Sequence, residues 1–442
     1  MLTIDDLEAG FHDGAKPPER WRLGVEHECP AVDLKGHTIP YHGPSGVGAV
    51  LGALAEGSDW KPVLEGDNTI ALAGDGASIT LEPGGQIEMS GRLWSSVHQA
   101  RAEIDRHIDS LVAVGRKLGV RFLASGTVPK STLEAIDWMP KRRYEIMRAI
   151  MERAGSLGHR MMKQTATVQS NFDYADEADA RLKFRLCMAL SPILVAMSAN
   201  SPVIEGRLSG YKSYRAKVWT GTDPDRCGLL DFAFDTEGLF RAYTEYALDV
   251  PMYFLARNQA LIPVWPVSFR QFLAKGHDGH QATLDDWHLH LSTIFTEVRL
   301  KTYIEVRSAD SQAANLVVAT PAFVKGLLYE RDCLEAAWDL VGRWSMSERL
   351  EAGAEAARHG LAGRARRHRL SDFAAALLGI AREGLDRQGQ LDAEGRSEAV
   401  HLDALAADVA DGRCPADRII EGWEGPWSGQ TDRLIEALDY AD

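Results

Sequence analysis

The stretch Glu297-Val298-Arg299-Leu300-Lys301-Thr302-Tyr303-Ile304-Glu305-Val306-Arg307 alternates polar and apolar residues. Successive side chains of a β-strand point to opposite faces, so the pattern predicts a strand with one face in the core. The other face would carry the odd-numbered residues, which are Arg299, Lys301, Tyr303, Glu305 and Arg307. A single strand of this kind is also typical of a solvated sheet surface. Its meaning therefore depends on whether other strands bring matching polar faces.

Three earlier stretches repeat the alternation. In 21–28 one parity holds Glu26 and Glu28, whereas His27 falls on the opposite face and is expected in the core or behind the site. In 78–90 one parity holds Glu82 and Glu88 on either side of a Pro-Gly-Gly insert. Such an insert can form a bulge or let a backbone or ligand approach closely. In 165–173 one face carries polar residues only, namely Thr165, Thr167, Gln169, Asn171 and Asp173.

The four polar faces together offer oxygen donors without cysteine or histidine. The carboxylates are Glu26, Glu28, Glu82, Glu88 and Glu305, and the amides are Gln169 and Asn171. Clustered glutamates raise one another's pKa values unless a metal ion neutralises them. Hard oxygen ligands favour Mg²⁺, and nearby Arg299, Lys301 and Arg307 would bind phosphate groups. If the strands share one sheet with these faces together, the pattern predicts phosphoryl transfer from ATP.

A further cluster of cations lies at the predicted start of a helix in 139–148. Lys141, Arg142 and Arg143 follow one another there. Cations at a helix N-terminus oppose the macrodipole, so the cluster favours a bound anion. A solvated patch of positive charge explains the pattern equally well.

Composition limits the possible partners. The 442-residue chain is 45% hydrophobic and 25% charged, and its net charge of −14 argues against nucleic-acid or anionic-membrane binding through bulk electrostatics. No apolar run approaches the roughly 18 residues of a transmembrane helix, and the first residues lack a signal-peptide pattern. The five scattered cysteines fit a reducing compartment. We therefore expect a cytoplasmic protein without nucleic-acid or membrane partners.

The pattern of the whole chain predicts an α+β fold. Antiparallel strands concentrate in about the first 310 residues, with helices expected at 96–118, 176–199 and 237–257. Further helices are expected at about 322–341, 346–358, 366–384, 396–411, 415–423 and 430–440. No linker divides the chain, so one catalytic domain is expected over 1–442, with a sheet-bearing core at 1–320 and a helical part at 321–442.

Long motifs resemble the plant and proteobacterial type of glutamate–cysteine ligase. They span 24–28, 81–91, 140–147, 167–171, 214–226, 246–254 and 297–307, in order across nearly the whole chain. The resemblance implies a glutamine-synthetase-like fold of the carboxylate–amine ligase superfamily, in which an antiparallel sheet forms a funnel-shaped active site around ATP and Mg²⁺.

The resemblance also implies a reaction. The γ-carboxylate of glutamate attacks the γ-phosphate of ATP to give γ-glutamyl phosphate, and the amine of cysteine then displaces phosphate. This is the first step of glutathione-type thiol biosynthesis. The implied ligands are glutamate, cysteine or another amine, ATP, and about two or three Mg²⁺ ions for which Mn²⁺ can substitute. A monomer or homodimer is expected.

The resemblance assigns roles to single residues. The implied metal ligands are Glu26, Glu28, Glu82, Glu88, Gln169 and Glu305. Glu305 and Arg307 are the implied catalytic residues, and Arg299, Lys301 and Asn171 are expected to bind nucleotide. The substrate-pocket motifs are matched by Arg143, Tyr144, Arg215 and Trp219, and an arginine suits bidentate capture of a carboxylate.

The chain departs from the family pattern in three places, one of which is Ala166, just before Thr167, where the family has a cysteine. Cys29-Pro30 replaces a lysine and an aromatic residue, and 308–314 replaces a Gly-Ala-Asp-Gly-Gly-Pro-Trp run. If the segment 308–314 shapes the acceptor pocket, the acceptor amine differs from cysteine. Three alternatives therefore remain: a γ-glutamyl ligase with another acceptor, a non-catalytic glutamate or nucleotide sensor, and a metal-dependent hydrolase. The retained carboxylates argue against a sensor, and the lack of a suitable nucleophile or histidine argues against a hydrolase.

Overall fold

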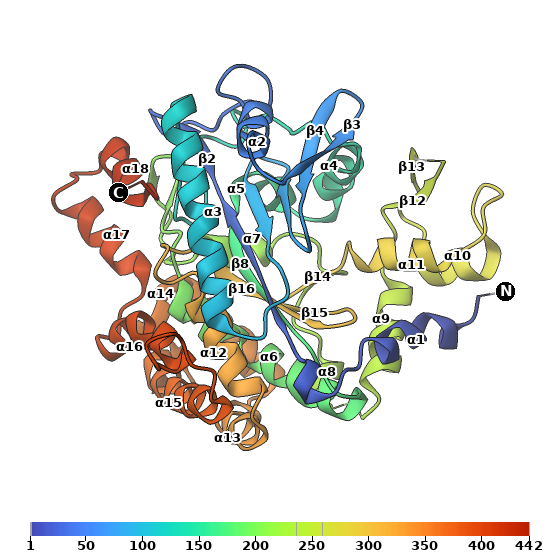
Figure 1. Cartoon of the computed structure of the whole chain (residues 1–442). Helices are drawn as coiled ribbons and strands as arrows, with labels where there is room; N and C mark the ends of the chain where they lie inside the picture. The colour runs from blue at the N-terminus through green and yellow to red at the C-terminus, as the bar shows by residue number, and fades with distance from the viewer. Residues whose placement is uncertain (1, 236, 259, 442) are drawn as a thin grey trace.

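The computed structural model describes residues 2–235, 237–258 and 260–441 (Figure 1). At its centre lies an eight-stranded sheet with the order β15-β16-β8-β1-β6-β5-β4-β3, and each neighbouring pair is antiparallel. Its strands are β1 (Leu23–Cys29), β3 (Lys61–Glu65), β4 (Asn68–Ala73), β5 (Ser78–Leu81), β6 (Ile87–Ser90), β8 (Thr167–Phe172), β15 (Val298–Leu300) and β16 (Ile304–Asp310). The α+β class expected from the sequence is confirmed.

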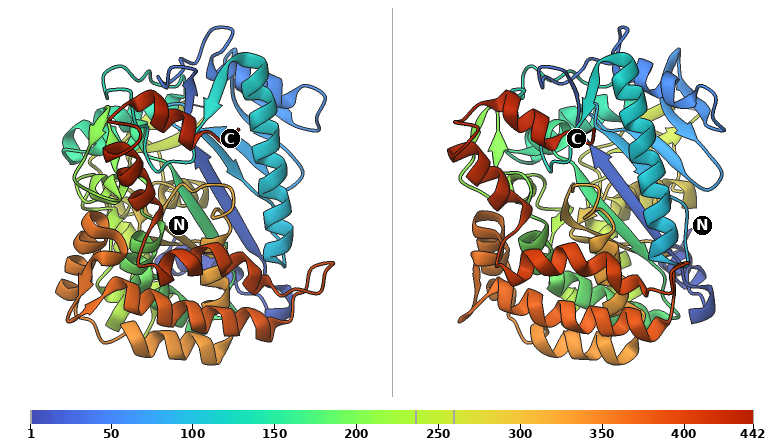
Figure 2. Two further views of the ribbon diagram at one scale, coloured as in Figure 1. Left: turned by 90° about the vertical axis from the view of Figure 1, so that its left-hand side faces the viewer. Right: turned by 60° about the vertical axis from the view of Figure 1, so that its left-hand side comes forward.

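Three long helices pack on the apolar face of this sheet. They are α3 (Val97–Leu118), which contacts β1, α6 (Glu177–Ser198), which contacts β15 and β16, and α12 (Ala319–Leu328), which contacts β1 and β8. The C-terminal helices, in orange and red, form the lower end of the molecule in Figures 1 and 2, and the last two, α17 (Pro415–Glu424) and α18 (Thr431–Leu438), extend upward along one side. The others are α13 (Arg331–Val341), α14 (Met346–His359), α15 (Leu370–Gln388) and α16 (Asp403–Ala410).

Shorter elements surround the opposite face and the edges. The helices are α1 (Ile4–Asp13), α2 (Val47–Ala55), α4 (Arg142–Ala154), α5 (Gly158–Gln164), α7 (Tyr214–Trp219), α8 (Phe232–Asp235), α9 (Leu239–Asp249), α10 (Phe269–Lys275) and α11 (Leu284–Leu291). The small strand pairs are β2–β7 (Ala31–Asp33, Val120–Phe122), β9–β10 (Val203–Ile204, Arg207–Leu208), β11–β14 (Cys227–Gly228, Phe295–Thr296), β12–β13 (Phe254–Arg257, Ala260–Pro263) and β17–β18 (Arg364–Ala365, His368–Arg369).

Local sequence explains where the two longest helices begin. The Ser96 hydroxyl accepts a hydrogen bond from the His98 amide at 3.1 Å at the start of α3, and the Asp176 carboxylate accepts one from the Asp179 amide at 2.8 Å at the start of α6. Gly119 ends α3 with φ of +68°, a conformation that glycine adopts without strain. Almost all of α6 beyond Ala180 is buried, so its apolar residues pack the core, as predicted.

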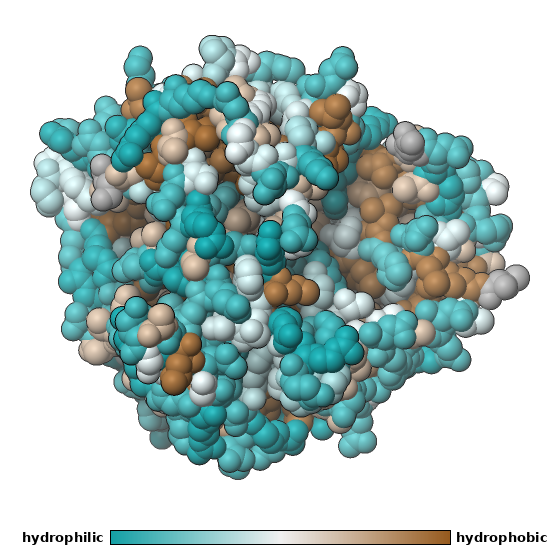
Figure 3. Space-filling view, viewed as in Figure 1, coloured by the Kyte–Doolittle hydropathy of each residue, from teal (hydrophilic) through white to brown (hydrophobic). Residues whose placement is uncertain are grey.

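The outer surface is mostly hydrophilic in the view of Figure 3, with hydrophobic side chains gathered on the side where β12, β13, α10 and α11 lie. Among the described residues, none of the helices combines the length and the apolar character that crossing a bilayer requires.

The register of the sheet brings the polar faces of its strands to one side. The decisive pairs are Glu28 with Glu88, Glu26 with Gln169, and Glu305 with both Asn171 and Arg299. Directly opposed residues on neighbouring strands share a face. The strand order and facing that the sequence argument required are therefore present.

The stretch 297–307 is a hairpin, so the prediction of one continuous strand is wrong. β15 ends at Leu300, β16 begins at Ile304, and 301–303 form the turn between them. The turn keeps odd-numbered residues in phase, because Arg299 stands directly opposite Glu305. Alternation alone could not reveal the turn, and neither glycine nor proline marks it.

Some predicted helices have different bounds. The helix expected at 237–257 is only α9, because Pro251 disfavours helical backbone just before it, and β12 follows. The helix expected at 322–341 is divided into α12 and α13, and α15 begins only after the β17–β18 hairpin. The segment 396–411 starts with a 3₁₀ turn at Glu398–Leu402 before α16.

The Pro-Gly-Gly insert forms the turn between β5 and β6. The Glu82 amide donates to the Gln86 carbonyl at 2.9 Å, so the two strands stay in register and Thr80 pairs with Glu88. A Cβ atom on Gly84 would lie 2.2 Å from the Lys163 backbone oxygen. The insert therefore lets a second backbone approach closely, as predicted.

We expect Gly84→Ala to lower the free energy of unfolding by about 1–3 kcal/mol, because the added methyl group must displace the backbone of Lys163. Urea unfolding measures the change. The matched control is Gly52→Ala in α2, where an added Cβ meets open space and should stabilise the helix by about 1 kcal/mol. Equal stability of the two variants would contradict the close approach at Gly84.

Candidate functional site

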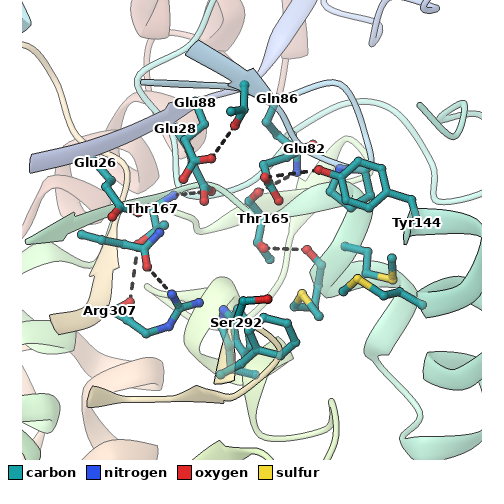
Figure 4. Close-up of a pocket in the computed structure, with 18 of the residues that line it drawn as sticks. Glu26, Glu28, Glu82, Gln86, Glu88, Tyr144, Thr165, Thr167, Ser292 and Arg307 are labelled. Carbon is teal, nitrogen blue, oxygen red and sulfur yellow. Dashed lines mark hydrogen bonds between the residues drawn. The ribbon is translucent and has the colours of Figure 1, made fainter. Parts of the chain in front are cut away.

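A cavity of about 280 Å³ opens on the polar face of the sheet (Figure 4). It is bounded by the sheet, by α4, α5 and α7, and by the segment before β15. The predicted residues that line it are Glu26, Glu28, Glu82, Glu88, Arg143, Tyr144, Gln169, Arg215, Trp219, Arg299 and Arg307. Three other predicted residues are not part of its lining, namely Asn171, Lys301 and Glu305.

Four glutamates form one wall of the cavity, and Arg307 and Ser292 lie across from them (Figure 4). Three of the glutamates accept one hydrogen bond each: Glu26 from the Asn171 amide group at 2.9 Å, Glu28 from the Thr167 backbone at 3.1 Å and Glu88 from Thr80 at 2.6 Å. The Tyr144 hydroxyl lies 3.5 Å from Glu82, but it donates its one proton to the Leu81 carbonyl at 2.6 Å. Within the described residues, none of the four forms an ion pair. We call these four residues the acidic wall.

Burial raises the pKa of every carboxyl group in the acidic wall. The pKa of Glu26 rises to about 7, through burial and then the charges of Glu305 and Glu88. The pKa of Glu88 also rises to about 7, through burial and the charge of Glu82. Burial, and then the charges of Glu82 and Glu88, raise the pKa of Glu28 well above its ordinary value. Nearby cations such as Lys141 and Arg307 act in the opposite direction, but they do not outweigh burial.

Glu305 lies in the opposite electrostatic environment, although it shares the same sheet face. Its fully buried carboxylate is held by both sides of the Arg299 guanidinium, with Nη2 at 2.7 Å from Oε1. Lys301 and Arg307 approach it at 3.6 and 3.5 Å. Burial alone would raise the pKa of Glu305, but these three cations outweigh burial and lower it.

Arginines supply the positive charge of the cavity. Arg307 donates a hydrogen bond to Gln169 and lies beside the rings of Trp219 and Phe295, at 5.8 and 5.9 Å from their centroids. In the described part of the chain, the Nε of Arg143 is buried without a hydrogen-bond partner, and its guanidinium enters no ion pair. Arg143 is therefore available to an anionic ligand.

Arg215 reaches the cavity from α7 and is only 3% exposed. Its Nη1 and Nη2 atoms donate to the carbonyls of Ser308 and Arg307, at 3.2 and 2.8 Å. Trp219 follows it on the same helix, and its indole nitrogen is buried without a hydrogen-bond partner among the described residues.

Sequence reasoning missed part of the lining. The added residues are Thr80, Pro83, Gln86, Lys141, Met147, Met161, Met162, Thr165, Thr167, Ser292 and Phe295. Lys141 belongs to the cation cluster noted before α4, and its Nζ lies 3.5 Å from the Tyr144 hydroxyl. Burial lowers the pKa of Lys141. The threonines were visible on polar strand faces, whereas the α5 methionines and Ser292 carry no signal in the sequence.

The segment after Arg307 does not line this cavity. β16 contains a bulge, because Val306 pairs with Ser170 and Ala309 pairs with Val168. Arg307 and Ser308 thus stand opposite Gln169 alone, which aims Arg307 at the cavity.

The donor set of the acidic wall fits a hard divalent cation. Carboxylate oxygens with an amide oxygen at Gln169 are typical Mg²⁺ ligands. Burial, and then the neighbouring carboxylates, raise the pKa values of Glu26, Glu28 and Glu88. Over the residues that the structure describes, however, no group of three or more such acidic, histidine or cysteine side chains is arranged to hold an ion. Some of these carboxylates would have to change rotamer to bind one.

We expect Arg299→Met to lower the free energy of unfolding by about 3–5 kcal/mol, because Glu305 would lose its bidentate partner inside the protein. Denaturant unfolding followed by circular dichroism measures this. Arg331→Met is the matched control, since it removes the arginine of an exposed ion pair with Glu335 and should leave stability nearly unchanged. A small effect at Arg299 would contradict the importance of the buried pair.

Comparisons with known proteins place the chain in a family. The family model "Glutamate-cysteine ligase family 2" matches residues 22–437. The chain is 41% identical to the chloroplastic glutamate–cysteine ligase of Brassica juncea, over 99% of this chain and 84% of that protein. It is 40% identical to the chloroplastic enzyme of Arabidopsis thaliana, over 99% of this chain and 83% of that protein.

A solved structure has the same fold at much lower identity. The glutamate–cysteine ligase of Francisella tularensis in complex with AMP superposes with a TM-score of 0.59 at 13% identity, over 94% of this chain and 87% of that one. With the family match and the full-length relatives, this result leads to one conclusion. The chain belongs to glutamate–cysteine ligase family 2.

Proposed function

We propose that the chain joins the γ-carboxylate of L-glutamate to the amine of L-cysteine, converting ATP to ADP and phosphate through γ-glutamyl phosphate. The observation that carries this proposal is the acidic wall facing Arg307 across a cavity that the unpaired Arg143 also lines, in a member of this ligase family. Phosphoryl transfer requires charge neutralisation and positioning more than covalent help from the protein. The cavity offers both.

Glu26, Glu28, Glu82 and Glu88, with Gln169, are the residues that would hold Mg²⁺. The ion would neutralise the phosphate oxygens of ATP and orient the γ-phosphate. Arg307 is placed to stabilise the charge on the transferring phosphoryl group, since its guanidinium lines the cavity opposite the acidic wall. Arg299 would contact the nucleotide at the end of the cavity beside β15.

The three predicted residues outside the lining would act through neighbours. Asn171 donates to Glu26 and so orients a metal ligand. Lys301 lies near Glu305, and together with Arg299 it neutralises that carboxylate. Glu305 would become a metal ligand itself only by giving up one of its contacts with Arg299.

Substrate recognition is proposed for the side of the cavity formed by α4, α5 and α7. Arg143 and Arg215 suit the carboxylates of glutamate, and Tyr144 and Trp219 shape the space beside them. The acceptor would lie against a soft apolar wall of Met147, Met161, Met162 and Phe295. Polarizable thioethers and rings favour a thiol side chain, which supports cysteine as the acceptor.

The alternative functions predict different results in an activity assay. The segment 308–314 favours a different amine acceptor only if it shapes the acceptor pocket, and it lies outside the cavity lining. A hydrolase would need a group that activates water, and no histidine is among the lining residues. A cytoplasmic location, a monomeric or dimeric state and a single catalytic domain remain predictions; the plant relatives are chloroplastic by name.

The full chain with ATP, Mg²⁺ and glutamate should release phosphate rapidly only when cysteine is added, and γ-glutamylcysteine should accumulate in equal amount. A panel of other amino acids and amines tests the acceptor, with mass spectrometry of the products. Turnover with another amine alone would replace cysteine in the proposal. No phosphate release with any amine would overturn the ligase assignment and favour the sensor.

Glu28→Gln should raise the Mg²⁺ concentration needed for half-maximal activity at least about 10-fold, because a neutral amide is a poorer ligand for a hard cation. The amide oxygen can still accept the hydrogen bond from Thr167, so folding should be preserved. The control Glu335→Gln changes an exposed acid on α13 and should leave the Mg²⁺ dependence unchanged. An unaltered Mg²⁺ titration in Glu28→Gln would remove this residue from the ligand set.

A further inference from the structure

Asp310 ends β16 as a carboxylate that is only 1% exposed and lies outside the cavity. It accepts three hydrogen bonds, from the Asn200 amide at 2.8 Å, the Ser201 hydroxyl at 2.6 Å and the Ser213 hydroxyl at 2.8 Å. Arg215 Nη1 lies 4.0 Å from Oδ1 of the same carboxylate. A buried acid with this many donors is held in one orientation.

The two serines connect Asp310 to the first turn of α7. Ser213 is the N-cap, and its hydroxyl oxygen accepts from the Ala216 amide at 3.1 Å. The Ser201 hydroxyl oxygen accepts from the Arg215 amide, also at 3.1 Å. Each hydroxyl gives its one proton to Asp310 and keeps lone pairs for these amides. One carboxylate therefore fixes both oxygens that cap the helix.

The capped helix brings two residues to the cavity. Arg215 and Trp219 are four positions apart, so they lie on one face of α7, and both line the cavity. At the far end of the Arg215 side chain, the guanidinium donates hydrogen bonds to the carbonyls of Arg307 and Ser308. These carbonyls belong to β16, as Asp310 does. A single strand thus holds both the backbone and the side-chain end of Arg215.

We infer that Asp310 is a positioning residue that sets the place of Arg215 for binding the carboxylate of the donor substrate. The inference rests on the proposed function, in which Arg215 contacts glutamate. It gives the segment after Arg307 a role other than acceptor choice. Asp310 itself does not touch the substrate.

The loop that carries Gly126 packs closely against the side chain of Asp310. A Cβ on Gly126 would lie 2.6 Å from Asp310 Cβ and Cγ, so the loop bearing Gly126 presses directly on this side chain. Asn200 Nδ2 donates to the carbonyls of Ala124 and Ser311, at 2.9 and 2.8 Å, and joins the same loop to the strand end. A longer acid at position 310 would not fit this space.

Asp310→Asn tests the inference by steady-state kinetics on the full chain. Its amide nitrogen cannot accept a hydrogen bond, so one serine loses its acceptor and the cap of α7 loosens. The KM for glutamate should rise about 10- to 100-fold, while kcat and the KM for ATP should stay within about threefold. An unchanged KM for glutamate, or equal losses for glutamate and ATP, would overturn the inference.

A double-mutant cycle separates positioning from a general loss of stability. If Asp310 acts through Arg215, then adding Asp310→Asn to Arg215→Met should raise the KM for glutamate less than about twofold further. Independent, multiplying effects would contradict the inference. Glu398→Gln is the matched control, because it alters a buried acid paired with Lys325, away from α7, and should leave the glutamate KM unchanged.

Ser213→Ala serves if Asp310→Asn does not fold. It removes one bond to Asp310 and the N-cap acceptor of α7, and it should raise the KM for glutamate about 3- to 10-fold without a change for ATP. Absence of turnover in the unmodified chain would overturn the proposed function and this inference together. Normal turnover with an unaltered glutamate KM in both variants would overturn the inference alone.

Discussion

The face that β1, β6 and β8 share brings carboxyl groups so close together inside the protein that burial and mutual repulsion oppose their ionisation. Burial and mutual repulsion raise the pKa of Glu26 and Glu88 to about 7, and no ion pair within the described residues offsets this cost. A rigid antiparallel register maintains the arrangement because the other face of the same strands is apolar and packed, as at Val25 and Val168. The acidic wall therefore holds carboxyl groups with raised pKa values on a fixed backbone frame.

One strand away, the same sheet face has the opposite charge balance. Glu305 is surrounded by Arg299, Lys301 and Arg307, and its pKa falls although it is fully buried. Within the described residues, one sheet face therefore presents carboxyl groups without ion pairs on β1 and a carboxylate surrounded by cations on β16. The boundary runs between Glu26 and Asn171, whose side chains are hydrogen-bonded to each other. The division of charge follows from the register together with the contacts that Arg299, Lys301 and Arg307 make with Glu305.

The register of the sheet brings the polar faces of the strands together. The alternation of polar and apolar residues was sufficient to predict the acidic wall, because alternation is a local property of each strand. It could not show that Glu305 is enclosed by Arg299, since that contact requires the unmarked turn at 301–303. It also could not find Ser292 or the methionines of α5, because they reach the cavity through tertiary packing of helices and loops. The local sequence pattern predicts which side chains share one face of a strand, and long-range packing decides which other residues lie against that face.

The bulge in β16 separates a part of the strand that faces the cavity from a part that contacts loops and α7. Up to Arg307 its odd-numbered residues face the cavity, and beyond the bulge Asp310 pairs with Thr167, so the parity of the polar face is reversed. The residues that differ from the family pattern lie beyond this point, where they contact loops and α7 instead of the cavity. The end of β16 acts on α7 instead, because Asp310 accepts hydrogen bonds from the two serine hydroxyls that in turn accept from the first amides of that helix.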